Sequence, residues 1–111
     1  MESPPILLIT GVDCRPGKEK AFNEWYDSSF PPAMIEVPGI TRIDRYERLE
    51  EDDNIPRFLS IVQFENMEAV DNMVNIEMVA SLGKRYIEEG SKFGIRFYWA
   101  ARYRSIYSTK K

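Results

Sequence analysis

Two short segments of the chain are apolar in both alternating phases of an extended strand. They are ILLITGV (6–12) and RFLSIVQFE (57–65), which are rich in β-branched and aromatic residues. Because successive side chains of a strand point to opposite faces of a sheet, such segments predict strands that are buried on both faces. The sheet therefore needs helices over one face and a second apolar cover over the other.

A helix is predicted between the first strand and the next. Over residues 18–27, Ala21, Phe22, Trp25 and Tyr26 recur at three- and four-residue spacing and form one apolar stripe. Pro31 and Pro32 follow, and because proline is tolerated in a first turn, the helix either continues or restarts there. The Pro38-Gly39 pair then ends the helical region.

The second half of the chain holds two further strands and a second helical segment. Asn66 is a plausible N-cap, Tyr86 is among the residues predicted to face inward, and Gly90 is the predicted C-cap. The predicted elements are a strand over 40–49, an acidic turn over 50–56, the strand over 57–65, helical segments from 66 to 74 and from 78 to 89, and a long strand over 95–107.

The order strand, helix, strand, strand, helix, strand predicts an α+β, ferredoxin-like βαββαβ fold over residues 1–111 as a single domain. Its usual form is a four-stranded antiparallel sheet with two helices on one face. Two helices cover one face only, and the other face would leave a large apolar patch in water. We therefore expect a homodimer, in which two sheets pack face to face and enclose a space between them.

The composition excludes several classes of site. The chain has 111 residues and no histidine, which removes His-ligated metal or haem and any Ser-His or Cys-His nucleophile. We expect no metal and no bound cofactor. The net charge of −3, from 15 basic and 18 acidic residues, gives no reason to expect nucleic acid as a partner.

The N-terminal region and the single cysteine indicate a compartment. The apolar run from Ile6 to Ile9 is too short for a signal peptide or a membrane span, so no membrane association is expected. Cys14 has no second cysteine with which to form an intramolecular disulfide, and a reducing, cytoplasmic location is the natural interpretation.

Three residues are candidates for acid–base chemistry. Asp27 follows Trp25, and a carboxylate beside an apolar wall can have a raised pKa and abstract a proton from a carbonyl-activated carbon. Tyr26 and Tyr46 are candidates to polarise the carbonyl oxygen. The alternative is structural: Trp25 packs in the core, and Asp27 caps a helix or pairs with a nearby arginine.

Five more residues are candidates for binding a small aromatic or carboxylic ligand. Arg42 and Arg45 would hold a developing enolate, and the rest would line the pocket; the set is Trp25, Phe30, Arg42, Arg45 and Trp99. The last strand also carries a basic, aromatic phase that either seats an anionic or phenolic ligand between the sheets or is an edge or outer face paired with acidic residues: Arg96, Tyr98, Arg102 and Arg104.

The run NEWYDSSFPPAMIEVPGITRIDRYE (23–47) resembles the dimeric α/β-barrel superfamily, and within it the EthD-like small proteins. The match lies in EWYD at the end of the early helix, the prolines, and the PGI that leads into a strand carrying RY, with the strand order matching over nearly the whole chain. Such relatives carry a histidine after the Tyr-Asp pair, and Phe30 stands in that place here. A mechanism that uses this histidine is therefore not transferable.

The resemblance implies a homodimer that binds a small molecule. Members of the superfamily include monooxygenases acting on polyketide aromatics, haem-degrading enzymes, isomerases, and dehydratases or cyclases. Two functions stay open: a cofactor-free lyase, isomerase or oxygenase acting on aromatic or polyketide-like compounds, and a non-catalytic interaction module. An open pocket touching Asp27 or Tyr46 favours the first, and a cavity plugged by Phe30, Met34 and Trp99 favours the second.

Overall fold

The computed structural model describes residues 5–111 and contains one four-stranded antiparallel sheet with helices on one face. The strand order across the sheet is β2-β3-β1-β4. The elements in chain order are β1 (Ile6–Asp13), α1 (Glu19–Met34), β2 (Ile40–Glu47), β3 (Phe58–Phe64), α2 (Met67–Met73), α3 (Glu77–Gly90), the 3-10 turn η1 (Ser91–Phe93) and β4 (Arg96–Arg104).

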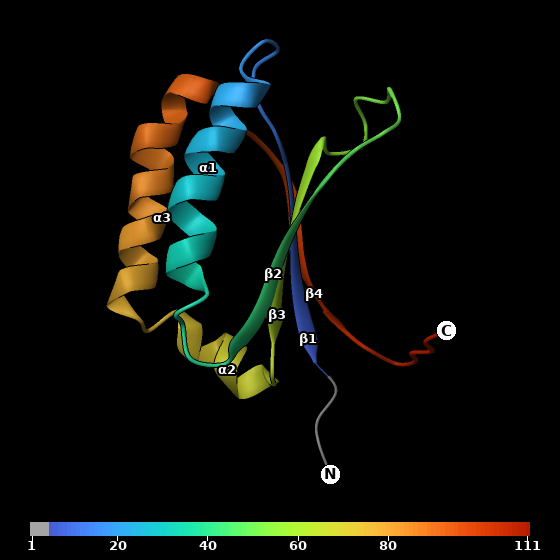
Figure 1. Ribbon diagram of the computed structural model, residues 1–111. Helices are drawn as coiled ribbons and strands as arrows, with labels where there is room; N and C mark the ends of the chain where they lie inside the picture. Colours follow the sequence, from blue (N-terminus) through green and yellow to red (C-terminus); the bar gives the residue numbers. More distant parts are fainter. Residues whose placement is uncertain (1–4) are drawn as a thin grey trace.

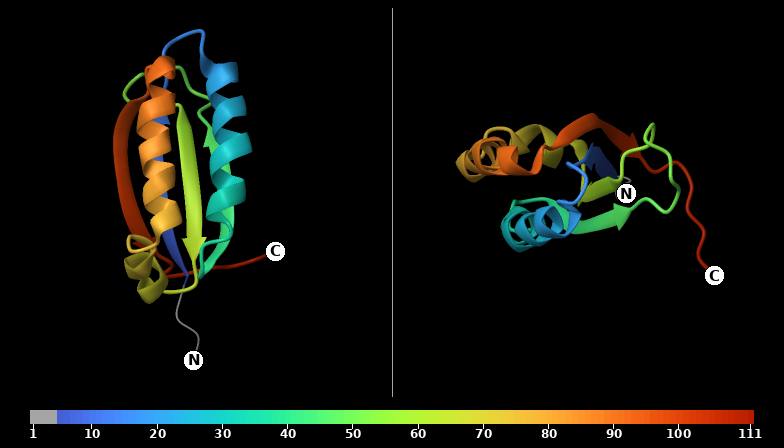
Figure 2. Two further views of the ribbon diagram at one scale, coloured as in Figure 1. Left: turned by 90° about the vertical axis from the view of Figure 1, so that its left-hand side faces the viewer. Right: turned by 90° about the horizontal axis from the view of Figure 1, so that it is seen from above.

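The long helices α1 and α3 stand side by side over the same face of the sheet (Figure 1), and both views of Figure 2 show this layering. The opposite face is covered by no helix among residues 5–111. The predicted ferredoxin-like α+β fold is therefore confirmed. It follows that any cavity under the helices and any surface on the opposite face are separated by the sheet.

Helix α1 runs without a break through both prolines and ends at Met34. Of the two alternatives that the sequence left open, the helix therefore continues. Because proline has no backbone N–H, Pro31 and Pro32 leave the carbonyls of Asp27 and Ser28 without their usual helical donors. The chain then turns through Gly39, whose φ of 89° lies in the left-handed region that glycine tolerates.

The second helical segment is two helices, and its end differs from the prediction. Asn66 is the N-cap of α2, because its side-chain oxygen accepts the backbone N–H of Ala69 at 2.9 Å, as predicted. The predicted C-cap at Gly90 is wrong, since Gly90 keeps a right-handed φ of −72° and the chain continues into η1. The left-handed residue is Gly94, with φ 61°.

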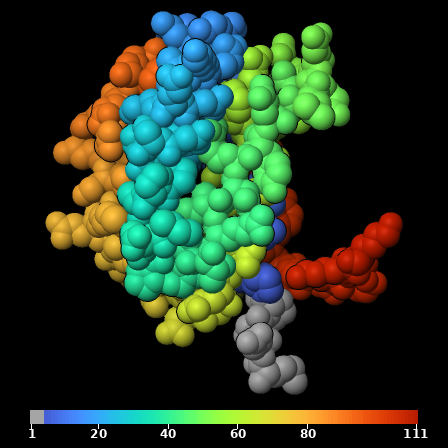
Figure 3. All heavy atoms as spheres, in the orientation of Figure 1, coloured from blue at the N-terminus to red at the C-terminus, as the bar shows by residue number. Residues whose placement is uncertain are grey.

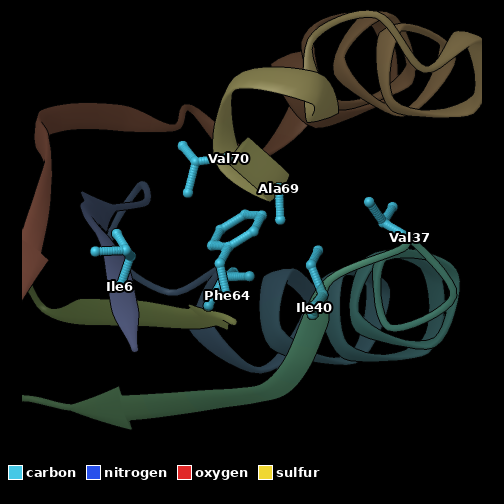
Figure 4. Close-up of a cluster of buried hydrophobic side chains, with 7 residues drawn as sticks. Ile6, Val37, Ile40, Phe64, Ala69 and Val70 are labelled. Atoms are coloured by element: carbon cyan, nitrogen blue, oxygen red, sulfur yellow. The ribbon is translucent and has the colours of Figure 1, made fainter. Parts of the chain in front are cut away.

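Two apolar clusters hold the helices on the sheet. In the first, the Phe64 ring lies between the sheet and α2, close to Ala69, Val70 and Ile40 (Figure 4). The second surrounds Phe22 of α1, which is fully buried against Phe58 and Phe93 with ring centroids 5.7 Å and 5.9 Å away. Between these two clusters, the helices and the sheet leave a space.

The last strand is shorter than the sequence predicted. Strand β4 ends at Arg104 rather than at residue 107, because β1, its hydrogen-bonded neighbour, begins at Ile6, which pairs with Arg104. Residues 105–111 leave the sheet and stand clear of the body on the side away from the helices (Figures 1 and 3). Ile106 is 96% exposed and Tyr107 is 81% exposed in the single chain.

Candidate ligand-binding site

A cavity of about 310 Å³ lies between the sheet and the two long helices. This volume is at the small end of the range of about 300–1,000 Å³ that is usual for small-molecule sites. The walls come from α1 and α3, and the floor comes from β1, β2 and β3. Phe97 of the edge strand β4 also lines the cavity and is 63% exposed, so the cavity is open to solvent on that side.

The strand register places one polar row across the floor of this cavity. Arg45 pairs with Ser60, and Ser60 pairs with Thr10, so three hydrogen-bonding side chains lie next to one another on three adjacent strands. The cavity-lining members of the rows on either side are apolar: Ile43, Val62 and Leu8 on one side, and Phe58, Val12 and Phe97 on the other. The floor therefore has a single line along which an oxygen-bearing ligand can hydrogen bond.

Arg45 is the charged end of the polar row. One terminal nitrogen, Nη1, donates to Asp27 Oδ1 at 2.7 Å and to Asn23 Oδ1 at 3.0 Å. Its guanidinium carbon lies 4.5 Å from the Tyr26 ring centroid, which is cation–π distance. The Arg45 Nε is buried and has no hydrogen-bond acceptor among the described residues. A buried donor without an acceptor is costly, so this N–H is an unusual feature of the polar row.

Asp27 lies at the rim of the cavity rather than inside it. Its side chain is 55% exposed, whereas that of Arg45 is 15% exposed. The carboxylate pairs with Arg45 and holds the guanidinium in place against the helix. This arrangement agrees with the structural alternative for Asp27, in which the carboxylate pairs with a nearby arginine.

An aromatic wall closes the cavity on the helix side. Tyr26 and Phe30 of α1 stack with ring centroids 5.0 Å apart, and Tyr86 of α3 meets Phe30 edge-on at 5.6 Å. Trp25 lies behind this wall, against Phe30 and Phe93, and its indole N–H donates to Glu89 Oε1 at 3.2 Å. Phe30 therefore forms part of the wall and leaves the cavity open.

Tyr86 holds its proton more strongly than an ordinary tyrosine. Burial raises the pKa of Tyr86 to about 12, with a further increase from Tyr26, while the positive charge of Arg45 acts to lower it. In the unfolded chain a tyrosine pKa is about 10. Tyr86 therefore stays a neutral hydroxyl, able to donate a hydrogen bond, throughout the physiological range.

This pKa difference predicts a loss of stability at high pH. Below pH 10 the group is protonated in both states, and between about pH 10 and about 12 only the unfolded chain loses the proton, which lowers the free energy of unfolding. Urea unfolding of wild type and Tyr86→Phe at pH 9, 10 and 11 measures this term. We expect wild type to lose at most about 1 kcal/mol relative to the variant by pH 11, after allowance for the remaining solvent exposure. Parallel pH profiles for the two proteins would contradict it.

The structure separates the residues that the sequence grouped into one pocket. Tyr26, Phe30 and Arg45 line the cavity, with Trp25 and Asp27 next to them. The remaining three candidates lie on the opposite face of the sheet: Arg42, Tyr46 and Trp99. The cavity lies between the helices and the sheet, whereas the sequence predicted a space between the sheets of two subunits.

On that opposite face the register forms three rows. They are Tyr46, Leu59, Gly11 and Trp99; Asp44, Ile61, Ile9 and Ala101; and Arg42, Gln63, Leu7 and Tyr103. Arg42 donates to Asp44 at 2.6 Å, and this hydrogen bond and charge raise the pKa of Arg42. The guanidinium is therefore already paired within its own strand.

The alternating basic and aromatic residues of the last strand are partly paired with other side chains and partly exposed to solvent. Arg102 lies 3.9 Å from Asp71 of α2, and the Arg96 guanidinium lies 4.7 Å from the Tyr98 ring centroid. Arg102 and Arg104 sit on the helix-side face of the sheet, opposite Leu8 and Ile6 in the register, and none of the four basic or aromatic residues lines the cavity. These contacts favour the alternative in which these residues belong to an edge strand and pair with acidic side chains.

Sequence reasoning missed three residues of the site. Thr10 and Ser60 are the only polar side chains in the inward phases of β1 and β3, and this interruption of an apolar phase was the available signal. Gly83 lies in the wall formed by α3, where an isolated glycine in a helical pattern was the signal.

Over residues 5–111 the structure contains no cluster of three or more acidic, cysteine or histidine side chains arranged to hold a metal ion. Within the same residues, no helix has the length and apolar character needed to cross a membrane. Cys14 is buried, and burial raises the pKa of its thiol, followed in effect by the nearby charges of Glu19 and Asp13.

Solved structures share this architecture at low sequence identity. HapK from Hahella chejuensis is 12% identical with a TM-score of 0.73, over 96% of this chain and 97% of that one. An EthD family protein from Bacillus halodurans is 12% identical with a TM-score of 0.66, over 93% and 99%. A MhuD variant with two manganese protoporphyrin IX molecules bound per active site is 11% identical with a TM-score of 0.68, over 96% and 99%.

No protein-family model matches the sequence, and no curated protein matches it. At identities of 11–12%, likeness to solved structures shows the fold alone. The resemblance to the dimeric α/β-barrel superfamily and its EthD-like members is thus confirmed at the level of architecture: the chain has the ferredoxin-like α+β fold of these proteins.

Proposed function

We propose that this chain is a small-molecule-binding protein whose ligand is a flat, largely apolar compound with an acidic oxygen, held in the cavity under α1 and α3. The observation that carries the proposal is Arg45, which lines a cavity with apolar walls and whose buried Nε has no acceptor among the described residues. A guanidinium in such a place binds a carboxylate or enolate oxygen strongly, because the low local dielectric strengthens the charge-assisted hydrogen bond.

The rest of the cavity supports an aromatic or polyketide-like ligand. Tyr26, Phe30 and Tyr86 present ring edges and faces against which a flat ring can pack. Ser60 and Thr10 continue the polar row from Arg45 at intervals of one strand spacing, about 4.8 Å, so further oxygens of the ligand can bond along this line.

The same groups suit a cofactor-free reaction. Arg45 is placed to stabilise the developing negative charge of an enolate, and the phenols of Tyr26 and Tyr86 are hydrogen-bond donors beside it, as a lyase, isomerase or oxygenase of this type would require. In this proposal Asp27 positions Arg45 and is not itself the base. Tyr46 and Trp99 act on the other face, as part of the dimer interface.

The alternative of a non-catalytic module with a self-filled cavity has less support. Phe30 and Met34 line the cavity and leave about 310 Å³ open, and Trp99 lies across the sheet from it. Neither Asp27 nor Tyr46 lines this cavity, although Asp27 pairs with the lining residue Arg45. A ligand site is therefore the better explanation for this volume.

We also propose that two copies form a homodimer through the sheet face opposite the helices. Its three rows place Leu7, Ile9, Leu59 and Ile61 at the centre, with large aromatic side chains at the edges. In the single chain Tyr46 is 53% exposed and Tyr103 is 51% exposed. Aromatic side chains are enriched in stable interfaces, where they contribute much of the binding energy. The single buried cysteine supports a cytoplasmic location for this dimer.

The binding test compares two ligands of one shape and different charge. We expect 2-naphthoate to raise the melting temperature, because a ligand at 100 times its Kd adds about 2.7 kcal/mol to the free energy of unfolding. The neutral 2-naphthamide should have much less effect. Isothermal titration calorimetry then measures both affinities. If the acid and the amide bind equally well, Arg45 does not hold the acidic oxygen of the ligand. If neither compound binds, the proposed function is contradicted.

A further inference from the structure

Gly83 differs from every other glycine of the chain in having no structural requirement for glycine. Three of the six glycines, Gly17, Gly39 and Gly94, have positive φ. At Gly11 a Cβ atom would lie 2.6 Å from Pro56, and at Gly90 it would lie 2.7 Å from Ile95. Gly83 lies inside a regular helix, and a Cβ built there would have no atom within 4 Å.

A glycine in a helix interior lowers stability relative to alanine, because it loses more backbone entropy on folding. Position 83 therefore carries a cost that neither the backbone nor the packing of the chain explains. Gly83 is exposed, and it also lines the ligand cavity together with Val79, Leu82 and Tyr86 of the same helix, so a side chain added there would extend from the edge of that cavity.

We propose that Gly83 sets the width of the ligand: a second fused ring of a bound aromatic acid lies against the bare backbone of α3, where a side chain would displace it. This inference rests on the proposed function, and it narrows the ligand class to aromatic acids broader than one ring. Arg45 lies on the floor of the cavity, on β2, and Gly83 lies on the wall formed by α3, so the acid group and the far ring would contact different elements.

The test measures affinities of benzoate and 2-naphthoate for wild type, Gly83→Ala and Ser81→Ala. Ser81 is an exposed residue of α3 that does not line the cavity, so its change to alanine controls for helix propensity. We expect wild type to bind 2-naphthoate more tightly than benzoate. Gly83→Ala should raise the melting temperature of the free protein, weaken 2-naphthoate roughly tenfold or more and leave benzoate unchanged. Ser81→Ala should change neither affinity.

The outcomes separate the inference from the proposal beneath it. If wild type binds both acids and Gly83→Ala binds both equally well, or loses both in the same proportion, the role of Gly83 is overturned and the proposed function stands. If wild type binds neither acid while Gly83→Ala is still the more stable protein, the proposed function is overturned and the inference with it.

Discussion

Ile9→Arg is expected to convert the proposed homodimer into a monomer. Ile9 lies on β1, an inner strand, in the middle row of the uncovered sheet face, between Ile61 and Ala101. In a two-fold dimer the same patch meets itself, so the variant would bring two arginines into one apolar interface. Each charge would lose its hydration without gaining a partner, which costs several kcal/mol per ion.

Light scattering at micromolar concentration measures this change directly as a fall to the mass of one chain. The matched control is Val74→Arg, which places the same charge at a β-branched residue that is 72% exposed after α2 and off the sheet face. We expect the control to remain a dimer. A wild type that is already monomeric, or an Ile9→Arg variant that keeps the dimer mass, would contradict the proposed interface.

The fold was predictable because its signals are local. The two-phase apolar strands, the helical spacing of Phe22 with Trp25 and Tyr26, and the N-cap at Asn66 each depend on a few neighbouring residues. The errors were local too. Helix α3 includes Gly90 and is followed at once by a 3-10 turn, so the left-handed residue is Gly94, and the sequence gives no sign of how many residues such a turn adds.

The side of the sheet on which each site residue lies was not predictable in the same way. Arg45 and Tyr46 are neighbours in sequence and point to opposite faces, and in residues 40–49 neither phase is apolar enough to identify the inner one. The contacts that place Arg45 on the inner face come from residues distant in sequence. Arg45 packs on Tyr26 and donates hydrogen bonds to Asn23 and Asp27 of α1. Because a register shift of one residue exchanges the two faces, only the assembled sheet separates cavity residues from interface residues.

The same reason explains why the site extends beyond the predicted residues. Ser60 and Thr10 become part of one polar row only when β2, β3 and β1 are in register. Tyr86 was predicted to face inward, but its position beside Tyr26 and Phe30 depends on how α1 and α3 pack together. A role for Gly83 can be inferred only when the cavity that it lines is known.

Arg45→Met is expected to abolish most of the affinity for an aromatic carboxylate while the fold is retained. Methionine is shorter than arginine but keeps an apolar stem in the cavity, and it removes the charge and the Nε donor. A hydrogen bond to a charged group contributes about 1.5–3 kcal/mol, so the affinity for 2-naphthoate should fall roughly 10- to 150-fold. The free energy of unfolding should change by about 1 kcal/mol or less, because Asp27 is 55% exposed and stays hydrated without its partner.

Arg42→Met is the matched control, because Arg42 lies on the same strand and points to the other face of the sheet. It should bind 2-naphthoate as wild type does, and equal losses in the two variants would contradict the helix-side site.

Asp27→Asn should shift the affinity in the opposite direction. The amide oxygen can still accept the Arg45 hydrogen bond, but the competing negative charge is gone, so an anionic ligand should bind more tightly. A loss of binding in Asp27→Asn would instead assign the carboxylate to contact with the ligand, and Asp27 would return as a candidate base.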